Sequence, residues 1–124
     1  MLDQYRRGWA LRYLREAKAE LEAAREMPYM AQSLILEAIR KARNAIYYSL
    51  GEPAFIEGVV RDAAEKMQTG NDPVLKYLLE IEGTLQQLAQ LEEVDEEKAM
   101  KHADNLIQLA SEIVETLIGE KVED

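Results

Sequence analysis

Few side chains in this sequence could carry out catalysis or hold a metal ion. There is no cysteine, which excludes a thiolate nucleophile and a cysteine-ligated metal, and there is one histidine, His102. A carboxylate-bridged metal pair in a helical bundle requires Glu-x-x-His motifs, and Ala99 stands at the position of that glutamate. Because Leu106 follows His102 by four residues, we interpret His102 as a histidine at the boundary of an apolar face, not as a catalytic base.

Two pairs of glutamates have a spacing that places both carboxylates on one face of a helix. Glu16/Glu20 and Glu112/Glu115 would suit a magnesium-dependent pyrophosphatase, but neither pair has a matching second cluster, so we interpret them as solvated surface residues. The sequence also contains no Walker A loop, no Gly-x-Ser-x-Gly elbow and no dinucleotide-binding glycine fingerprint. We therefore predict no catalytic residue, no metal site and no cofactor.

Basic and aromatic residues occur together in the segment 40–48. Arg40 and Arg43 are predicted to form a basic ledge that binds phosphate, with further basic side chains supplied by residues 12–18. Tyr47 and Tyr48 follow at once, and aromatic rings beside guanidinium groups commonly hold nucleobases or single-stranded nucleic acid. Arg40, Arg43, Tyr47 and Tyr48 are thus the candidate ligand-binding residues. The alternative is that both tyrosines are half-buried fillers, and the net charge of −9 opposes nucleic-acid binding.

Three further aromatic residues recur at four-residue steps near the start of the chain. Tyr5, Trp9 and Tyr13 would share one face of a helix. In one interpretation this ridge belongs to the core. In the other it is an apolar surface for a partner, since such aromatic residues often anchor interfaces.

Helices must position these residues. Apolar residues recur at three- and four-residue steps, Phe55 and Val59 among them, and nowhere alternate strictly with polar ones over five or more positions. Proline and glycine delimit five expected helices, at about residues 3–26, 29–50, 53–68, 73–91 and 96–118. The predicted fold class is all-α, an up-and-down antiparallel bundle of about five helices in which four long ones form the core. The helix at 29–50 should be central.

Several residues indicate where these helices begin and end. Gly70 suits a left-handed turn, and Asp72 and Asp95 suit N-caps whose carboxylates accept hydrogen bonds from free backbone N–H groups. Gly83 interrupts the pattern of the fourth helix, where we expect it to mark a close crossing of two helices.

The length of 124 residues, at 14.2 kDa, is sufficient for one hydrophobic core. We expect a single domain over residues 1–118 with a frayed tail at 119–124. Residues 1–10 lack the apolar core of a signal peptide, and no apolar run approaches the roughly 20 residues that cross a bilayer. Together with the absence of cysteine, these features predict a cytoplasmic protein that has no contact with membranes.

Charge is distributed unevenly along the chain. Residues 1–50 carry nine basic and six acidic side chains, whereas residues 51–124 carry six basic and eighteen acidic ones. In one interpretation the charges only keep a small bundle soluble, because many pairs such as Glu37/Lys41 and Glu57/Arg61 have helical i,i+4 spacing. In the other interpretation, the opposite charges of the two parts of the chain steer association with a partner, and the acidic part binds a basic protein.

Three segments resemble HEPN domains: YLREAKAELEAARE at 13–26, AQSLILEAIRKA at 31–42 and ADNL at 103–106. HEPN domains are helical bundles, commonly dimeric and associated with small nucleotidyltransferases, and many are RNA-cleaving toxins. The resemblance implies a dimeric helical bundle whose protein partner is a small nucleotidyltransferase.

The catalytic members of that family carry an arginine followed four to six residues later by a histidine. Here tyrosine stands where that histidine would follow Arg43, and the residues at that spacing before His102 are not arginine: Lys98, Glu97 and Glu96. The resemblance therefore implies a noncatalytic member, a self-associating binding module. The alternative is a divergent HEPN-type ribonuclease, or a nucleotide- or RNA-binding protein that uses the basic ledge of the second helix.

Overall fold

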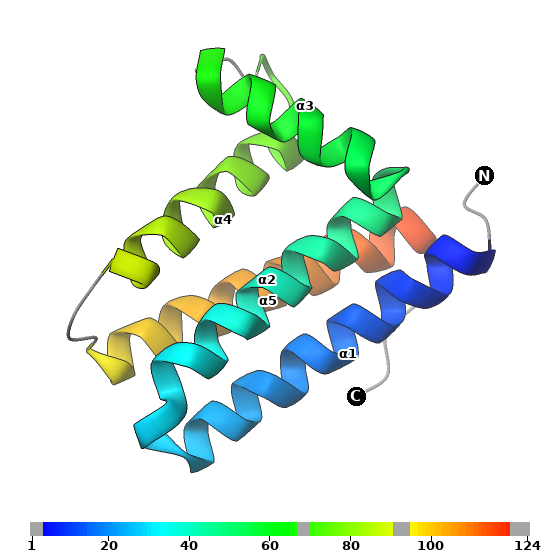
Figure 1. The fold of residues 1–124 in the computed structure, drawn as a ribbon. Coiled ribbons are helices and arrows are strands. Elements are labelled where there is room, and N and C mark those ends of the chain that lie inside the picture. Colours follow the sequence, from blue (N-terminus) through cyan, green and yellow to red (C-terminus); the bar gives the residue numbers. More distant parts are fainter. Residues whose placement is uncertain (1–3, 67–69, 91–94, 120–124) are drawn as a thin grey trace.

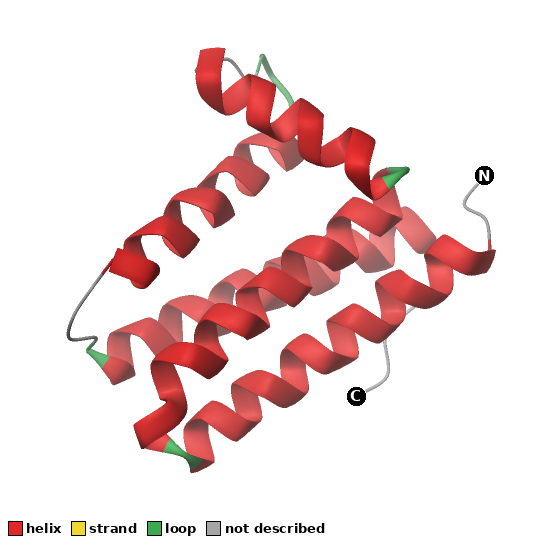
Figure 2. Ribbon diagram, in the orientation of Figure 1, coloured by secondary structure: helices red, strands yellow, loops and turns green. Residues whose placement is uncertain are grey.

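The computed structural model describes residues 4–66, 70–90 and 95–119. These residues form five α-helices and one short 3-10 helix, and no strand occurs among them (Figures 1 and 2). In chain order the elements are α1 (Gln4–Glu26), η1 (Pro28–Met30), α2 (Ala31–Leu50), α3 (Pro53–Lys66), α4 (Pro73–Gln90) and α5 (Glu96–Ile118). The predicted all-α bundle is confirmed. The expected helix ends at Gln68 and Leu91, and the tail from Glu120 onward, lie outside the described residues.

The helix α2 is central, because it packs against α1, α3, α4 and α5. The helices α1, α2 and α5 lie side by side (Figure 1), and alanines on these three helices are completely or almost completely buried. Such small side chains let neighbouring helix backbones approach closely. They are Ala10, Ala17, Ala38, Ala42, Ala45, Ala103 and Ala110.

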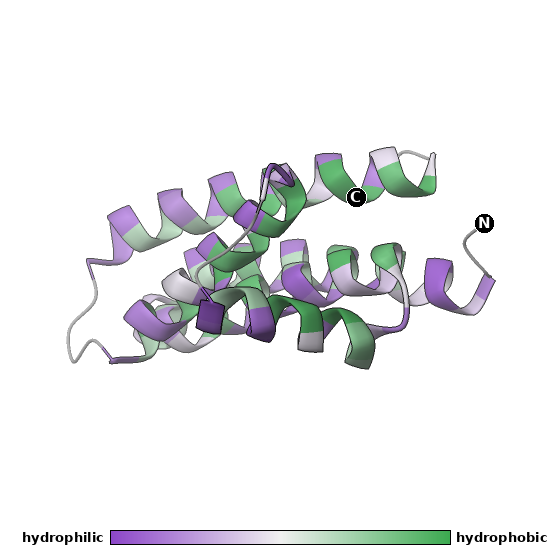
Figure 3. Cartoon of the chain, turned by 90° about the horizontal axis from the view of Figure 1, so that it is seen from above, coloured by the Kyte–Doolittle hydropathy of each residue, from purple (hydrophilic) through white to green (hydrophobic). Residues whose placement is uncertain are grey.

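The helix α4 completes the core from the other side of α2. Leu78, Ile81 and Leu85 are buried there, and the hydroxyl of Tyr77 donates a hydrogen bond to the backbone carbonyl of Leu106 on α5. Every described helix carries hydrophobic and hydrophilic residues along its length (Figure 3). None of the described helices is both long enough and apolar enough to cross a bilayer.

The predicted boundary residues act as expected where they are described. Asp72 Oδ1 accepts hydrogen bonds from the backbone N–H groups of Val74 and Leu75, at 3.0 and 3.2 Å. Asp95 Oδ1 accepts one from the N–H group of Lys98, at 3.2 Å. Gly70 has a left-handed backbone, with φ of 60°. These interactions lie within a few residues along the chain, which is why the sequence alone predicts them.

One expectation about helix packing is wrong, and one apolar stripe is only partly covered. Gly83 does not mark a close crossing, since it is exposed and a Cβ atom added to it would meet nothing within 4 Å. Phe55 and Val59 belong to the apolar stripe of α3, yet they are 69% and 41% exposed. The helix α3 crosses the bundle near the end of α2 and does not lie alongside α1, α2 and α5, so only part of its stripe is covered (Figure 1).

Candidate functional site

Arg43 and Tyr47 of the predicted basic ledge meet one carboxylate of α4. Arg43 Nη1 and the Tyr47 hydroxyl both donate hydrogen bonds to Glu82 Oε1, at 3.0 and 3.3 Å. The Arg43 guanidinium also lies 5.6 Å from the centroid of the Tyr47 ring. Tyr47 is buried, and its burial, followed by the nearby Glu82 charge, raises the pKa of its hydroxyl. These two ledge residues therefore join α2 to α4.

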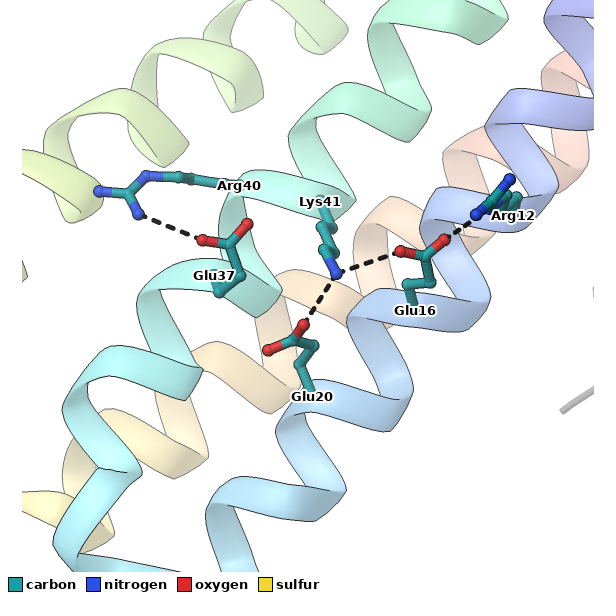
Figure 4. A network of polar contacts seen from close by, with 6 residues as sticks. All are labelled: Arg12, Glu16, Glu20, Glu37, Arg40 and Lys41. Carbon is teal, nitrogen blue, oxygen red and sulfur yellow. Dashed lines mark hydrogen bonds and ion pairs between the residues drawn. The ribbon is translucent and has the colours of Figure 1, made fainter.

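The other two ledge residues lie elsewhere on α2. Arg40 is exposed and its guanidinium lies 3.5 Å from a carboxylate oxygen of Glu37 (Figure 4). Tyr48 packs against α1, with its ring 6.2 Å from that of Trp9 and 5.6 Å from that of Tyr13. The structure thus brings together Arg43 and Tyr47 but places Tyr48 apart from them. Ligand binding by these four residues stays a prediction.

Four aromatic rings form a continuous surface feature, which we call the aromatic strip: Tyr5, Trp9 and Tyr13 of α1 and Tyr48 of α2. Neighbouring rings along α1 have centroids 6.3 and 5.5 Å apart, and the guanidinium of Arg12 lies 4.8 Å from the centroid of Trp9. Tyr5 is 68% exposed, while the other three rings are half-buried.

The sequence shows the periodicity of the strip on α1 but not the membership of Tyr48. Consecutive residues of an α-helix project about 100° apart. Tyr47 and Tyr48 are therefore directed to different neighbours, Tyr47 to α4 and Tyr48 to α1. Only the position of α1 beside α2 reveals that Tyr48 extends the strip.

The glutamates Glu16 and Glu20 converge on a lysine of the neighbouring helix. Lys41 Nζ lies 3.1 Å from Glu16 Oε1 and 2.8 Å from Glu20 Oε1 (Figure 4). The expected pairing of Lys41 with Glu37 is therefore wrong, because α1 presents two carboxylates on the side that faces Lys41. Hydrogen bonding to Lys41 is the main cause that lowers the pKa of Glu16, and the hydrogen bond to Glu20 raises the pKa of Lys41.

This ammonium occupies the place between the two carboxylates where a magnesium ion would have to sit. Among residues 4–66, 70–90 and 95–119, no group of three or more histidine or acidic side chains is arranged to hold a metal ion. The interpretation of Glu16 and Glu20 as surface carboxylates needs one refinement, since they bind α2 as well as facing solvent.

His102 lies on the exposed side of α5 and contacts α4. Its Nε2 atom is 3.2 Å from Oγ1 of the buried Thr84. Its position agrees with that of a histidine at the edge of an apolar face. Ala99 lies about one turn before His102, where a Glu-x-x-His motif would have its glutamate, and it is buried.

Two basic residues expected beside the ledge line a different surface. Arg15 and Lys18 border a groove of about 450 Å³ between α1 and α5. Arg25 lines the same groove and is held by the carboxylates of Glu22 and Asp104, at 2.7 and 2.9 Å. The groove thus contains basic side chains from three turns of α1, on a face of α1 that is separate from the one facing Lys41.

No family model matches this chain, and no curated protein and no solved structure matches it either. Four features of the described surface therefore bear on the function. They are the aromatic strip, the ion-paired ledge residues, the groove between α1 and α5, and the uncovered apolar residues of α3.

Proposed function

We propose that this chain is a cytoplasmic, noncatalytic HEPN-like helical bundle that acts as a binding module and associates with a second copy of itself through the aromatic strip. The observation that carries the proposal is the partly exposed ladder of rings on α1 and α2, with an arginine stacked on its tryptophan. Tryptophan, tyrosine and arginine are the residue types most enriched where protein interfaces derive their binding energy.

The rings of the strip are held in place before any partner arrives. Trp9 is packed between its neighbours Tyr5 and Tyr13 and against Tyr48, so little side-chain freedom remains to be lost on binding. A two-fold axis through such a strip places rings against rings, an arrangement that aromatic side chains favour when they are offset or tilted. The resemblance to HEPN domains, which are commonly dimeric, agrees with this arrangement and also suggests a small nucleotidyltransferase as a protein partner.

The charge of α1 gives the dimer a distinctive salt dependence. The described residues 4–15 carry four arginines and no acidic side chain, and one of the four, Arg12, is ion-paired with Glu16 at 2.9 Å, so a net positive charge remains on this part of α1. A two-fold axis near them brings like charges together, so added salt screens the repulsion and strengthens dimerisation. Binding to RNA has the opposite dependence, because salt weakens contacts with phosphate.

The test is analytical ultracentrifugation of the wild type and two variants at low and high salt. Tyr5→Ser removes an exposed ring from the strip without adding a charge and should raise the dimer dissociation constant about tenfold or more. Tyr29→Ser is the matched control, because Tyr29 is 84% exposed and lies in η1, outside the strip. A wild type that is monomeric at every salt and protein concentration would contradict self-association, as would equal effects of the two variants.

A second candidate function is favoured by the groove between α1 and α5. Its basic residues Arg15 and Lys18 and its volume of about 450 Å³ suit the phosphate of a nucleotide or of single-stranded RNA. The alternative location for such a ligand is the ledge around Arg40, Arg43 and Tyr47. An NMR titration at low salt with mixed nucleotides and a short unstructured RNA distinguishes the two, since amide shifts would gather at one site or the other.

An NMR spectrum that nucleotides and RNA leave unchanged would contradict binding of either ligand. Protein binding would then remain as the proposed function. A divergent ribonuclease requires in addition that RNA be cleaved. Cleavage that survives in the variants Arg43→Ala and His102→Ala would show that neither residue is part of its machinery.

A further inference from the structure

An apolar groove lies between α3 and α4, next to the end of α2. It has a volume of about 270 Å³ and eight lining residues, of which seven are apolar. The helix α3 contributes Ile56, Val59 and Val60, and α4 contributes Val74, Leu75 and Leu78. This groove has no role in the predicted ledge or in the aromatic strip.

Exposed apolar side chains continue the groove onto the surface. Leu50 and Val59 line it and are each more than a third exposed, and Phe55, one turn before Val59 on the same face of α3, is 69% exposed. Of the described residues of α3, the buried ones are Val60 and Ala63. Clustered apolar residues of this kind mark an interaction surface, whereas single ones scattered over a surface do not.

The two helices that form this groove carry more acidic than basic side chains. Residues 52–66 and 70–90 carry seven acidic and three basic side chains. Three of the acidic side chains are ion-paired, Glu57 with Arg61 at 3.1 Å and Asp62 with Lys66 at 3.2 Å within α3, and Glu82 with Arg43 of α2 at 3.0 Å, so a net negative charge remains on the two helices. Asp72 lies in the lining of the groove itself. A partner that complements this surface therefore has an apolar face flanked by lysine and arginine.

The groove also restricts the backbone conformation of its occupant. Its walls are side chains of helices, so it offers no strand edge, and the N–H groups of Val74 and Leu75 in the first turn of α4 are already bonded to the Asp72 carboxylate. An extended peptide would find no backbone partners there, whereas a helix satisfies its own backbone and presents apolar residues one and two turns apart. A second copy paired on this surface by a two-fold axis would set acidic side chains against acidic ones.

We propose that the groove between α3 and α4 binds the apolar face of a basic amphipathic helix that belongs to another protein. This interaction uses a surface distinct from the aromatic strip and does not depend on self-association. Charge attraction speeds the encounter, and burial of the apolar face of the partner helix against Leu50, Val59 and Leu75 holds it in place.

The probe is a synthetic peptide of about 18 residues, or five helical turns, with leucines along one face and lysines along the other. A second peptide keeps the leucines and replaces every lysine by glutamate. Binding of each to the full chain is measured by fluorescence anisotropy. We expect the leucine–lysine peptide to bind with a dissociation constant at least about tenfold lower than that of the leucine–glutamate peptide.

The matched variants are Val59→Arg in the groove and Leu109→Arg on α5. Both residues are similarly exposed, at 41% and 46%, and both changes add one positive charge, so general attraction to an acidic protein weakens equally. Val59→Arg should weaken binding about tenfold or more, and Leu109→Arg should leave it within about twofold. Val59→Ser, which adds no charge, should also weaken binding, and circular dichroism checks that all variants are folded.

Equal affinities of the two arginine variants would overturn the proposal, as would equal binding of both peptides. A wild-type dimer that Val59→Arg dissociates, while Tyr5→Ser does not, would also overturn it, because the occupant would then be a second copy. A monomeric chain that binds the lysine peptide at Val59 would contradict only the self-association proposed above. A stable dimer that binds neither peptide would contradict only the proposed binding of a helix in the groove between α3 and α4.

Discussion

Arg43 of α2 and Glu82 of α4 form an ion pair, with 3.0 Å between Nη1 and Oε1, and the Tyr47 hydroxyl donates a second hydrogen bond to that oxygen. The Arg43 side chain is 23% exposed, and among the described residues its Nε atom has no hydrogen-bond partner although it is buried. Because α4 is separated from α2 in the chain by α3, this pair joins two segments that are remote in sequence.

Removing Glu82 should destabilise the fold, because it leaves a largely covered cation and a buried hydroxyl without their acceptor. We expect Glu82→Ala to lower the free energy of unfolding by about 1–3 kcal/mol in urea denaturation. In the double variant Glu82→Ala/Arg43→Met, the loss in free energy of unfolding should be smaller than the sum of the losses in the two single variants, since both members of the pair are removed together. Glu57→Ala is the control, because the pair with Arg61 is exposed and should change stability by about 0.5 kcal/mol or less. Additive losses would contradict the coupling.

Lys41 should stabilise the contact between α1 and α2 at neutral pH but not in acid. The hydrogen bond to Lys41 lowers the pKa of Glu16, so its stabilising effect is present above the ordinary glutamate pKa and is lost as the pH falls below it. Lys41→Met should therefore melt at a lower temperature than the wild type at pH 7, with a difference that shrinks towards about pH 3. Arg61→Met, on an exposed pair, should melt close to the wild type. A difference between Lys41→Met and wild type that stays constant from pH 7 to about pH 3 would contradict this role.

Alkali should destabilise the protein through two buried tyrosines. Burial raises the pKa of Tyr47 and of Tyr77 above the ordinary value of about 10, so the folded state retains protons that the unfolded state releases. The resulting stability is fully present below pH 10 and declines above it, by up to about 1.4 kcal/mol per pH unit for each tyrosine. Tyr47→Phe and Tyr77→Phe should each flatten this decline, and the exposed Tyr29→Phe should not. An unchanged slope in both buried variants would refute the assignment.

The glycines at positions 83 and 119 should respond to alanine in opposite directions. Gly83 lies inside α4 with open space around it, so Gly83→Ala should stabilise the helix by about 0.5–1 kcal/mol. Gly119 ends α5 with φ of 76°, a left-handed backbone that alanine adopts only with strain, so Gly119→Ala should destabilise by about 1 kcal/mol. Thermal unfolding of the two variants measures both effects, and a loss of stability in Gly83→Ala would reveal a contact at that position.

Features that depend on residues close together in the chain can be predicted from the sequence alone. Apolar repeats of three and four residues determined the five helices, and Asp72 and Asp95 determined two of their starts, because each carboxylate bonds N–H groups two or three residues ahead. The exposed pair Glu57–Arg61 was likewise predictable from its i,i+4 spacing. Such interactions operate within one or two helical turns.

Which neighbouring helix each side chain contacts depends on how the whole chain folds. Lys41 had a local partner available in Glu37 but binds Glu16 and Glu20 of α1. A stripe of apolar residues shows that one face of a helix avoids water, yet the helix that covers it depends on the path of the whole chain. Phe55 and Val59 have the same helical spacing as covered residues elsewhere, and they lie exposed because α3 crosses the bundle instead of running along it.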